Sequence, residues 1–269
     1  LHLSLRRQRQ MCIRDSHVMR AAAESLTPVT LELGGKSPAI LSADVPLNHA
    51  AERIAFGKTL NAGQTCVAPD YVLVPHDRVE GFVEAYRQAV QRLYPQVDGN
   101  PDYTSIINTR QHQRLSDYLD DARDKGATVI TLTTAGAERR MSPTLLLNVD
   151  DSMRVMQDEI FGPLLPVVPY ERLSDALAYI AARPRPLALY YFGYDRSEQQ
   201  HVLHHSHSGG VCLNDTLMHV AQDDMPFGGV GASGMGHYHG HEGFLTFSKA
   251  KGVLIKPVSY THLTLPTKA

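Results

Sequence analysis

The sequence lacks the compositional biases that mark several classes of protein. Its 269 residues carry 26 Lys and Arg against 28 Asp and Glu, so its formal net charge of −2 gives no reason to expect nucleic acid or an anionic membrane as a partner. Apolar runs such as Ala39–Leu41 fall far short of the roughly 18 residues that a membrane-spanning helix needs. With 20 Gly and 16 Pro, a collagen-like or low-complexity chain is excluded as well.

Cysteine is scarce and irregularly placed. Cys12, Cys66 and Cys212 are odd in number, widely spaced and form no C-x-x-C pair. A disulfide framework is therefore not expected, and a reducing compartment, the cytoplasm, is the predicted location.

The two ends of the chain differ from the middle. The chain begins with Leu1, and residues 1–16 hold four arginines and one acid without a sustained helical stripe, which disfavours a transit peptide. Residues 258–269 show no relation to what precedes them. We expect both ends to be non-native tails that resemble translated adaptor sequence, and the chain between them to be part of a longer protein.

Between these ends, strand-like and helix-like patterns alternate. The clearest is a helical stripe of apolar residues at Val79, Phe82, Val83, Tyr86, Ala89, Val90 and Leu93, which Pro95 closes. Other helices are predicted over 17–26, 47–61, 109–125, 174–182 and 196–205. Strands are predicted over 29–33, 37–41, 71–74, 128–132, 144–147, 164–168, 187–192 and 211–214. This alternation predicts an α/β fold with a doubly wound parallel sheet.

Three motif-like patterns indicate no site of their own. Gly35-Lys36-Ser37 lacks the first glycine of a phosphate-binding loop. The formal G-x-G-x-x-G at 229–234 does not follow a predicted strand, so we interpret it as a loop that packs closely against another segment. The histidines at 204–207 have no metal-site spacing and are expected at the surface; those at 237–241 lie in a glycine-rich loop that could contact a substrate, and no metal is expected.

Cys66 stands in a setting that a structural cysteine rarely has. It follows Gly63-Gln64-Thr65, whereas Cys212 is enclosed by apolar neighbours. Small, polar neighbours let a substrate approach a nucleophilic thiol and leave backbone N–H groups for an oxyanion. These neighbouring residues alone do not decide between a catalytic and a structural role for Cys66. If the role is catalytic, the surroundings must favour the thiolate.

Glu32 interrupts the otherwise apolar segment Val29–Leu33 just before Gly34. It is expected at the carboxyl end of a parallel strand, where open α/β sheets bind ligands; the alternative is a solvent-facing position on an edge strand. Together, a thiol and a carboxylate base suit chemistry that proceeds through an acyl-enzyme.

Several segments, in this order, resemble the aldehyde dehydrogenase family over nearly all of 17–257. The residues at 31–38 (LELGGKSP) match its general-base motif, and those at 56–69 (FGKTLNAGQTCVAP) match its catalytic-cysteine motif. The 34 residues that separate Glu32 from Cys66 are also the family's spacing. The segments 159–163 (EIFGP), 226–229 (PFGG) and 233–234 (SG) match further family motifs. Residues 66–71 (CVAPDY) and 236–240 (GHYHG) are most similar to class 3 and coniferyl aldehyde dehydrogenases.

The resemblance implies an NAD- or NADP-dependent oxidation of an aldehyde, aromatic such as coniferyl aldehyde or medium-chain aliphatic, to the acid. It assigns the nucleophile to Cys66, the base to Glu32, and cofactor contacts to Leu33, Gly34, Glu159 and Phe161. It also implies a homo-oligomer, a dimer. The base at Glu32 disfavours a CoA-acylating relative, while an inert fragment or an interaction or oligomerisation module is the alternative from another class.

By the same resemblance, 17–35 is the remnant of an NAD-binding domain, 36–245 the catalytic domain and 246–257 a C-terminal segment. Most of the family's NAD-binding domain has no counterpart in this chain. We therefore expect this polypeptide by itself to bind NAD(P)+ only weakly.

Overall fold

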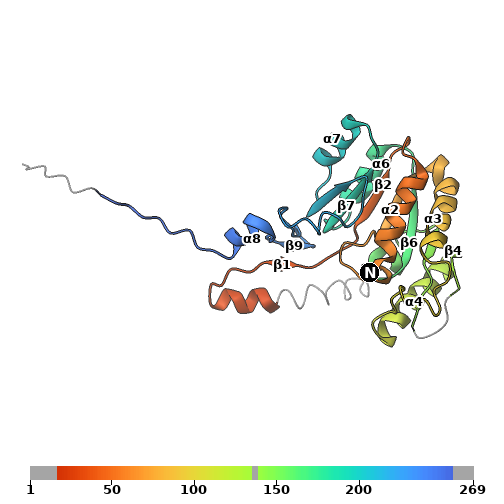
Figure 1. The fold of residues 1–269 in the computed structure, drawn as a ribbon, viewed down its shortest axis with the longest axis horizontal. Coiled ribbons are helices and arrows are strands. Elements are labelled where there is room, and N and C mark those ends of the chain that lie inside the picture. Colours follow the sequence, from red (N-terminus) through yellow and green to blue (C-terminus); the bar gives the residue numbers. More distant parts are fainter. Residues whose placement is uncertain (1–16, 135–138, 257–269) are drawn as a thin grey trace, which may run out of the picture.

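The centre of the structure is a seven-stranded sheet (Figure 1). The computed structural model describes residues 17–134 and 139–256, and the expected tails at 1–16 and 258–269 lie outside these residues. The strand order is β4-β5-β6-β3-β2-β7-β8, and every neighbouring pair is parallel except β4 with β5. The strands are β2 (Pro38–Leu41), β3 (Tyr71–Pro75), β4 (Thr128–Thr131), β5 (Thr144–Leu147), β6 (Leu164–Tyr170), β7 (Ala188–Phe192) and β8 (Gly210–Leu213).

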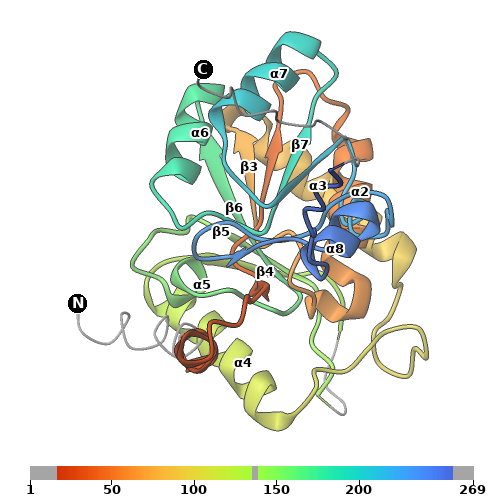
Figure 2. The same ribbon diagram turned by 90° about the vertical axis from the view of Figure 1, so that its left-hand side faces the viewer.

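Helices cover both faces of this sheet. Residues 17–24 are also helical. The other helices are α2 (Leu47–Thr59), α3 (Val79–Leu93), α4 (Thr109–Asp124), α5 (Arg154–Gln157), α6 (Leu173–Ala181), α7 (Arg196–His205) and α8 (Gly240–Thr246), with the 3-10 turns η1 (Leu60–Gly63) and η2 (His76–Arg78). Figure 2 shows α6 and α7 on the side of the sheet away from α2 and α3.

Alternation along each strand divides the core into two parts. Ala39 and Leu41 of β2 pack with the apolar sides of α2 and α3, whereas Ile40 between them packs with α4, α5, α6 and α7. Successive side chains of a strand point to opposite faces, so a sheet that is buried on both sides needs apolar residues at every position. The burial of all four residues of β2 meets this need and confirms the doubly wound sheet.

Most predicted elements are confirmed: α3 begins and ends where its periodicity predicts, and α7 has the predicted bounds. The short helices α5 and α8 and the strand β9 (Gly234–Met235) were not predicted. No helix in the two described stretches is long and apolar enough to cross a membrane. The division into domains at residues 35 and 245 stays a prediction.

One prediction about the sheet is wrong. The segment with Glu32 is not a parallel strand of the central sheet: β1 (Leu31–Glu32) pairs antiparallel with β9 in a separate two-stranded sheet. Glycine makes this pairing feasible, because a Cβ at Gly234 would lie 2.1 Å from the Leu31 carbonyl oxygen. Glu32 is therefore positioned by residues some 200 positions later in the chain. A local sequence pattern does not reveal such a pairing.

The glycine-rich loop at 229–234 packs closely against backbone, as its sequence predicts. A Cβ at Gly229 would lie 2.0 Å from the Ser233 carbonyl oxygen, and one at Gly228 would lie 2.1 Å from that of Gly236. The loop brings β9 against β1 and thereby forms one wall beside Cys66.

Candidate active site

A left-handed turn after α2 presents Cys66. Within η1, Asn61 and Ala62 have φ values of 51° and 52°, and Gly63 follows at 72°. A Cβ at Gly63 would lie 2.4 Å from the Gly162 carbonyl oxygen, so only glycine fits between the two segments. The turn ends the helix sharply and leaves Cys66, half-buried, in the loop before β3.

Buried polar groups hold this loop from two sides. The Gln64 side chain accepts a hydrogen bond from the Ile107 N–H at 2.9 Å and donates one to the Ser105 carbonyl at 3.2 Å. The Tyr190 hydroxyl, from β7, donates to the Val67 carbonyl at 2.5 Å. The residues on either side of Cys66 are thus fixed by groups that are distant in sequence.

The structure brings the two predicted catalytic side chains into contact. The Cys66 Sγ donates to Glu32 Oε1 at 3.3 Å, and the Tyr238 hydroxyl donates to Glu32 Oε2 at 2.9 Å. Tyr238 itself is held by a backbone bridge to Phe227, with N···O distances of 2.7 and 2.8 Å. Sequence reasoning placed Tyr238 in a loop that could contact a substrate but missed its contact with Glu32.

The thiol of Cys66 is held in its protonated form. Its pKa is raised from 9.0 to about 12, first by burial, then by the hydrogen bond to Glu32 and the charge of that carboxylate, and further by the charge of Glu159. The expectation that the surroundings favour the thiolate is therefore wrong for this structure. The physical reason is first that burial disfavours the charged thiolate, and then that Glu32 and Glu159 act on the sulfur.

Glu159 lies against the glycine pair that follows Glu32. A Cβ at Gly34, whose φ is +106°, would lie 2.9 Å from Glu159 Oε1, and the backbone of Gly35 hydrogen-bonds the carboxyl group. Burial and the neighbouring Asp70 raise the pKa of Glu159 from 4.5 to about 8. This half-buried carboxyl group therefore lies between the glycine pair and the catalytic loop.

The other two residues expected to contact the cofactor, Leu33 and Phe161, differ in how far they are buried. Leu33 is half-buried, and its N–H donates to the Ser233 carbonyl at 3.1 Å. Phe161 has a positive φ of 48° and a 41% exposed side chain, a conformation that turns a large apolar group toward solvent. Their roles stay predictions.

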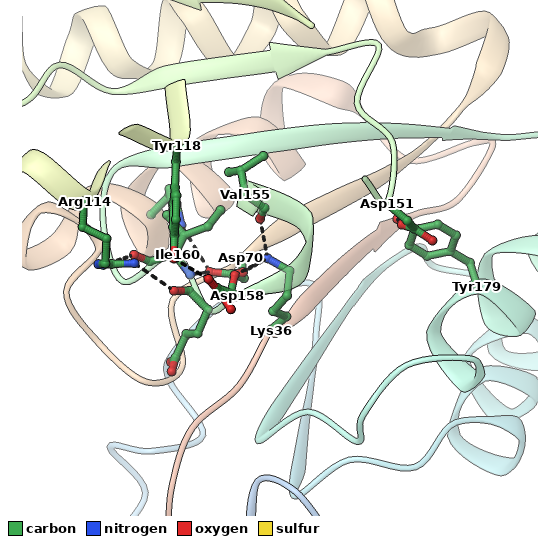
Figure 3. A network of polar contacts seen from close by, with 11 residues as sticks. Lys36, Asp70, Arg114, Tyr118, Asp151, Val155, Asp158, Ile160 and Tyr179 are labelled. Atoms are coloured by element: carbon green, nitrogen blue, oxygen red, sulfur yellow. Dashed lines mark hydrogen bonds and ion pairs between the residues drawn. The ribbon is translucent and has the colours of Figure 1, made fainter. Parts of the chain in front are cut away.

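Figure 3 shows a network of polar contacts around Lys36, Asp70 and Arg114 that sequence reasoning missed. The Asp70 carboxylate forms an ion pair with Lys36 and accepts the Ile160 N–H at 3.0 Å. Lys36 also donates to the Val155 and Asp158 carbonyls, at 2.8 and 3.0 Å. Arg114 of α4 donates to the carbonyls of Glu159 and Ile160, at 3.3 and 2.6 Å, and so fixes the backbone that carries Glu159.

Lys58 belongs to this network and is fully buried on α2. It shares the buried stripe of that helix with Ala50, Ala51, Ile54 and Ala55. A lysine in an apolar stripe is the signal that could have identified it, because charged residues are almost never fully buried unless paired.

Within the described residues, no group of three or more His, Cys, Asp or Glu side chains could hold a metal ion. The histidines at 204, 205 and 207 are exposed, as predicted. The residues expected to contact a nucleotide fit one in their chemistry. The side-chain-free surface of Gly34 lets a ligand or side chain approach the backbone closely, and Glu159 offers a carboxyl group that can accept hydrogen bonds from hydroxyl groups.

Comparison with known proteins agrees with these features. The model of the aldehyde dehydrogenase family matches residues 15–253. A probable coniferyl aldehyde dehydrogenase of Pseudomonas aeruginosa is 75% identical over 241 residues, which are 90% of this chain and 51% of that protein. The coniferyl aldehyde dehydrogenase of another Pseudomonas species is 50% identical over 93% of this chain and 53% of its own.

Solved structures give the same result. The substrate-bound state of Staphylococcus aureus AldH superposes with a TM-score of 0.83 at 42% identity, over 90% of this chain and 54% of that one. A Mycobacterium tuberculosis aldehyde dehydrogenase complexed with NAD+ superposes with a TM-score of 0.82 at 32% identity, over 93% of this chain and 52% of that one.

The chain therefore belongs to the aldehyde dehydrogenase family. It spans about half the length of the curated relatives that it matches. The relatives complexed with NAD+ support the use of NAD or NADP in this family branch, without distinguishing the two.

Proposed function

We propose that the protein containing this chain oxidises an aldehyde to the carboxylic acid with NAD(P)+, and that Cys66 and Glu32 carry the chemistry. The observation that supports this most directly is the 3.3 Å contact between Cys66 Sγ and Glu32 Oε1. A carboxylate that accepts the thiol proton can serve as the base for a nucleophilic cysteine.

In the first step, the Cys66 thiol passes its proton to Glu32 Oε1 while Sγ attacks the carbonyl carbon of the aldehyde. The thiohemiacetal that results carries a negative oxygen, and the Cys66 N–H is the proposed donor that stabilises it. Because the pKa of the thiol is about 12, attack and proton transfer to Glu32 must be coupled near neutral pH.

The cofactor, when bound, would supply the hydride acceptor, with Leu33, Gly34, Glu159 and Phe161 as its proposed contacts. Oxidation of the thiohemiacetal leaves a thioester on Cys66. Glu32 then releases the thiol proton to solvent and removes a proton from water, which hydrolyses the thioester. Tyr238 supports this role, because its hydroxyl holds the second oxygen of Glu32 and leaves Oε1 to act on the thiol or on water.

The substrate and assembly are parts of the same proposal. The identity to two coniferyl aldehyde dehydrogenases supports an aromatic aldehyde of that kind. Exposed apolar side chains toward the C-terminal end, such as Phe244, Phe247 and Leu254, support a homodimer. The free thiols of Cys66 and Cys212 support a reducing, cytoplasmic location.

Two substitutions, made in a protein of the relatives' full length that contains this chain, test the proposal. Cys66→Ala should abolish aldehyde oxidation and ester hydrolysis, since both need the sulfur. Glu32→Gln should remove the first-turnover burst of NADH and slow the steady rate by about 10²–10⁴-fold, because the thiol then lacks the carboxylate that takes its proton. Residual steady turnover of the folded Cys66→Ala variant would show that another residue is the nucleophile. If the wild-type protein showed no NAD(P)+-dependent oxidation, the interpretation as an inert fragment or interaction module would be favoured. If the acyl group were transferred to CoA rather than to water, the interpretation as a CoA-acylating enzyme would be favoured.

A further inference from the structure

One buried residue joins three of the segments from which the site is built. Asp70 is 2% exposed and lies four residues after Cys66. Its Oδ1 accepts the Ile160 N–H at 3.0 Å, and its Oδ2 pairs with Lys36 (Figure 3). Its own N–H donates to the Ser37 carbonyl at 2.7 Å. The loop of the proposed nucleophile, the segment after the proposed base and the segment expected to contact the cofactor therefore meet at this one residue.

Lys36 and Asp70 hold the backbone on both sides of Glu159. The Lys36 ammonium group donates to the carbonyl of the residue before Glu159, at 3.0 Å, and Asp70 accepts the N–H of the residue after it. Phe161 comes next, with a φ of 48°. A bulky residue keeps such a conformation only where its surroundings enforce it. The ion pair thus helps to fix the backbone of two residues that are expected to contact the cofactor.

The loop before Cys66 also packs directly against this segment. A Cβ at Gly63 would lie 2.4 Å from the Gly162 carbonyl oxygen. The turn before Cys66 and the segment after Glu159 therefore touch at one point, and Asp70 joins the same parts of the chain at a second. A single point of attachment would let one segment rotate about it, whereas two points fix their relative orientation.

The ion pair is a costly means of stabilising the fold. The side chains of Lys36 and Asp70 are only 14% and 3% exposed, so both charges lose most of their hydration. Apolar side chains of similar volume often stabilise such a place as well or better. A charged pair supplies instead hydrogen bonds of defined direction to backbone N–H and carbonyl groups, which apolar side chains cannot offer. This contrast indicates that the pair places the backbone rather than stabilises the fold.

We propose that Lys36 and Asp70 are positioning residues, which hold the segment expected to contact the cofactor where a carbon bound to Cys66 can pass its hydride to NAD(P)+. The inference rests on the proposed function and deepens it, because it takes Cys66 as the nucleophile and Glu159 and Phe161 as cofactor contacts. Each positioning residue acts through the backbone that it holds and not through contact with the substrate.

Two reactions of Cys66 distinguish this alignment from the general integrity of the site. In aldehyde oxidation, the thiohemiacetal alkoxide loses a hydride to NAD(P)+, which leaves the thioester and NAD(P)H, so this step depends on where the cofactor lies. Ester hydrolysis passes through the same sulfur but transfers no hydride. Because a misplacement of about 1 Å can slow a reaction by about 10²-fold, loss of the pair should slow the oxidation and spare the hydrolysis.

The first test uses a protein of the relatives' full length that contains this chain. In Lys36→Met, Lys58 remains as a cation 3.9 Å from Asp70 Oδ1, so the buried carboxylate is not left unpaired. The first turnover should form NAD(P)H about 10–10²-fold more slowly than in wild type, and deuterium at the aldehyde carbon should slow it further. Ester hydrolysis without cofactor should be nearly unchanged. Asp70→Asn, which keeps the shape of the side chain but loses its charge, should separate the two reactions in the same way.

Lys125→Met is the matched control. Lys125 also pairs with a carboxylate, that of Asp121 at 2.7 Å, and donates to a backbone carbonyl, that of Ser152 at 2.6 Å. It holds the chain before α5 rather than beside Glu159. Both reactions of the control should therefore proceed as in wild type.

The second test is made on this chain without cofactor and follows the backbone rather than activity. Amide hydrogen exchange at Ile160 should be faster in Lys36→Met and in Asp70→Asn than in wild type, because the segment is then held less firmly. Lys125→Met should leave the exchange at Ile160 unchanged.

Several results would contradict the inference. If the folded variants lost both reactions equally, or slowed the first turnover without a deuterium effect, the pair would have only a structural role. An unchanged first turnover, or unchanged exchange at Ile160, would overturn the inference and leave the proposed function intact. If one variant does not fold, the other carries the test. If wild type did not oxidise aldehydes with NAD(P)+, the proposed function itself would fail, and this inference with it.

Discussion

Glu32→Gln should make Cys66 more reactive toward alkylation, although the same change slows turnover. The Glu32 carboxylate raises the pKa of the thiol through a hydrogen bond and through its charge, and only the thiolate reacts with iodoacetamide. With a pKa of about 12, roughly one thiol in 10⁴ is ionised at pH 8. Wild-type Cys66 should therefore alkylate far more slowly than a free cysteine.

The size of the effect follows from the geometry. A unit charge at the 3.3 Å of the Cys66–Glu32 contact acts with up to about 5 kcal/mol at an effective dielectric constant of ~20. Glu32 is exposed, so solvent screening reduces this strongly, and burial is the larger cause of the raised pKa. We expect about one pKa unit, which is roughly a tenfold faster alkylation at pH 8.

The assay is the rate of carbamidomethylation of this chain at pH 8, with the modified cysteine identified by mass spectrometry because Cys12 and Cys212 are also present. Glu52→Gln removes an exposed carboxylate of α2 and serves as the matched control, which should react like wild type. If Glu32→Gln reacted no faster than wild type, the contact between Glu32 and the thiol would not control the proton on Cys66.

Two further outcomes are expected from thermal and denaturant unfolding. Gly34→Ala should destabilise the chain by roughly 1–3 kcal/mol, because the φ of +106° disfavours a side chain and the new Cβ would lie 2.9 Å from Glu159 Oε1. Gly99 is also at positive φ but has open space around it, so Gly99→Ala should lower the free energy of unfolding in urea by less. Equal losses in the two variants would argue against the steric contact. Burial raises the pKa of Glu159 from 4.5 to about 8, so the folded chain holds a proton that the unfolded chain has lost, and stability should fall as pH rises through this window. Glu159→Gln should remove that dependence and raise Tm by several degrees more at pH 8 than at pH 5. A parallel pH dependence in both proteins would exclude a raised pKa of Glu159.

The sequence by itself determined the sheet and its helices. Apolar periodicity is a local property, so α3 could be bounded residue by residue, and the alternation of strands and helices could be assigned to a sheet that is buried on both faces. The unusual setting of Cys66 and the break at Glu32 also identified the two residues that the fold brings within 3.3 Å. Both signals were local departures from the pattern of their segments.

Only the tertiary structure decided how these residues are held. Glu32 lies in a two-stranded sheet with Gly234, and Tyr238 holds its second oxygen; both partners are about 200 residues away, where no periodicity links them. The raised pKa of the Cys66 thiol and the buried ammonium group of Lys58, 3.9 Å from Asp70, depend on burial and on which charges meet in space. Contacts between distant segments follow from the packing of the whole chain, which local sequence patterns do not encode.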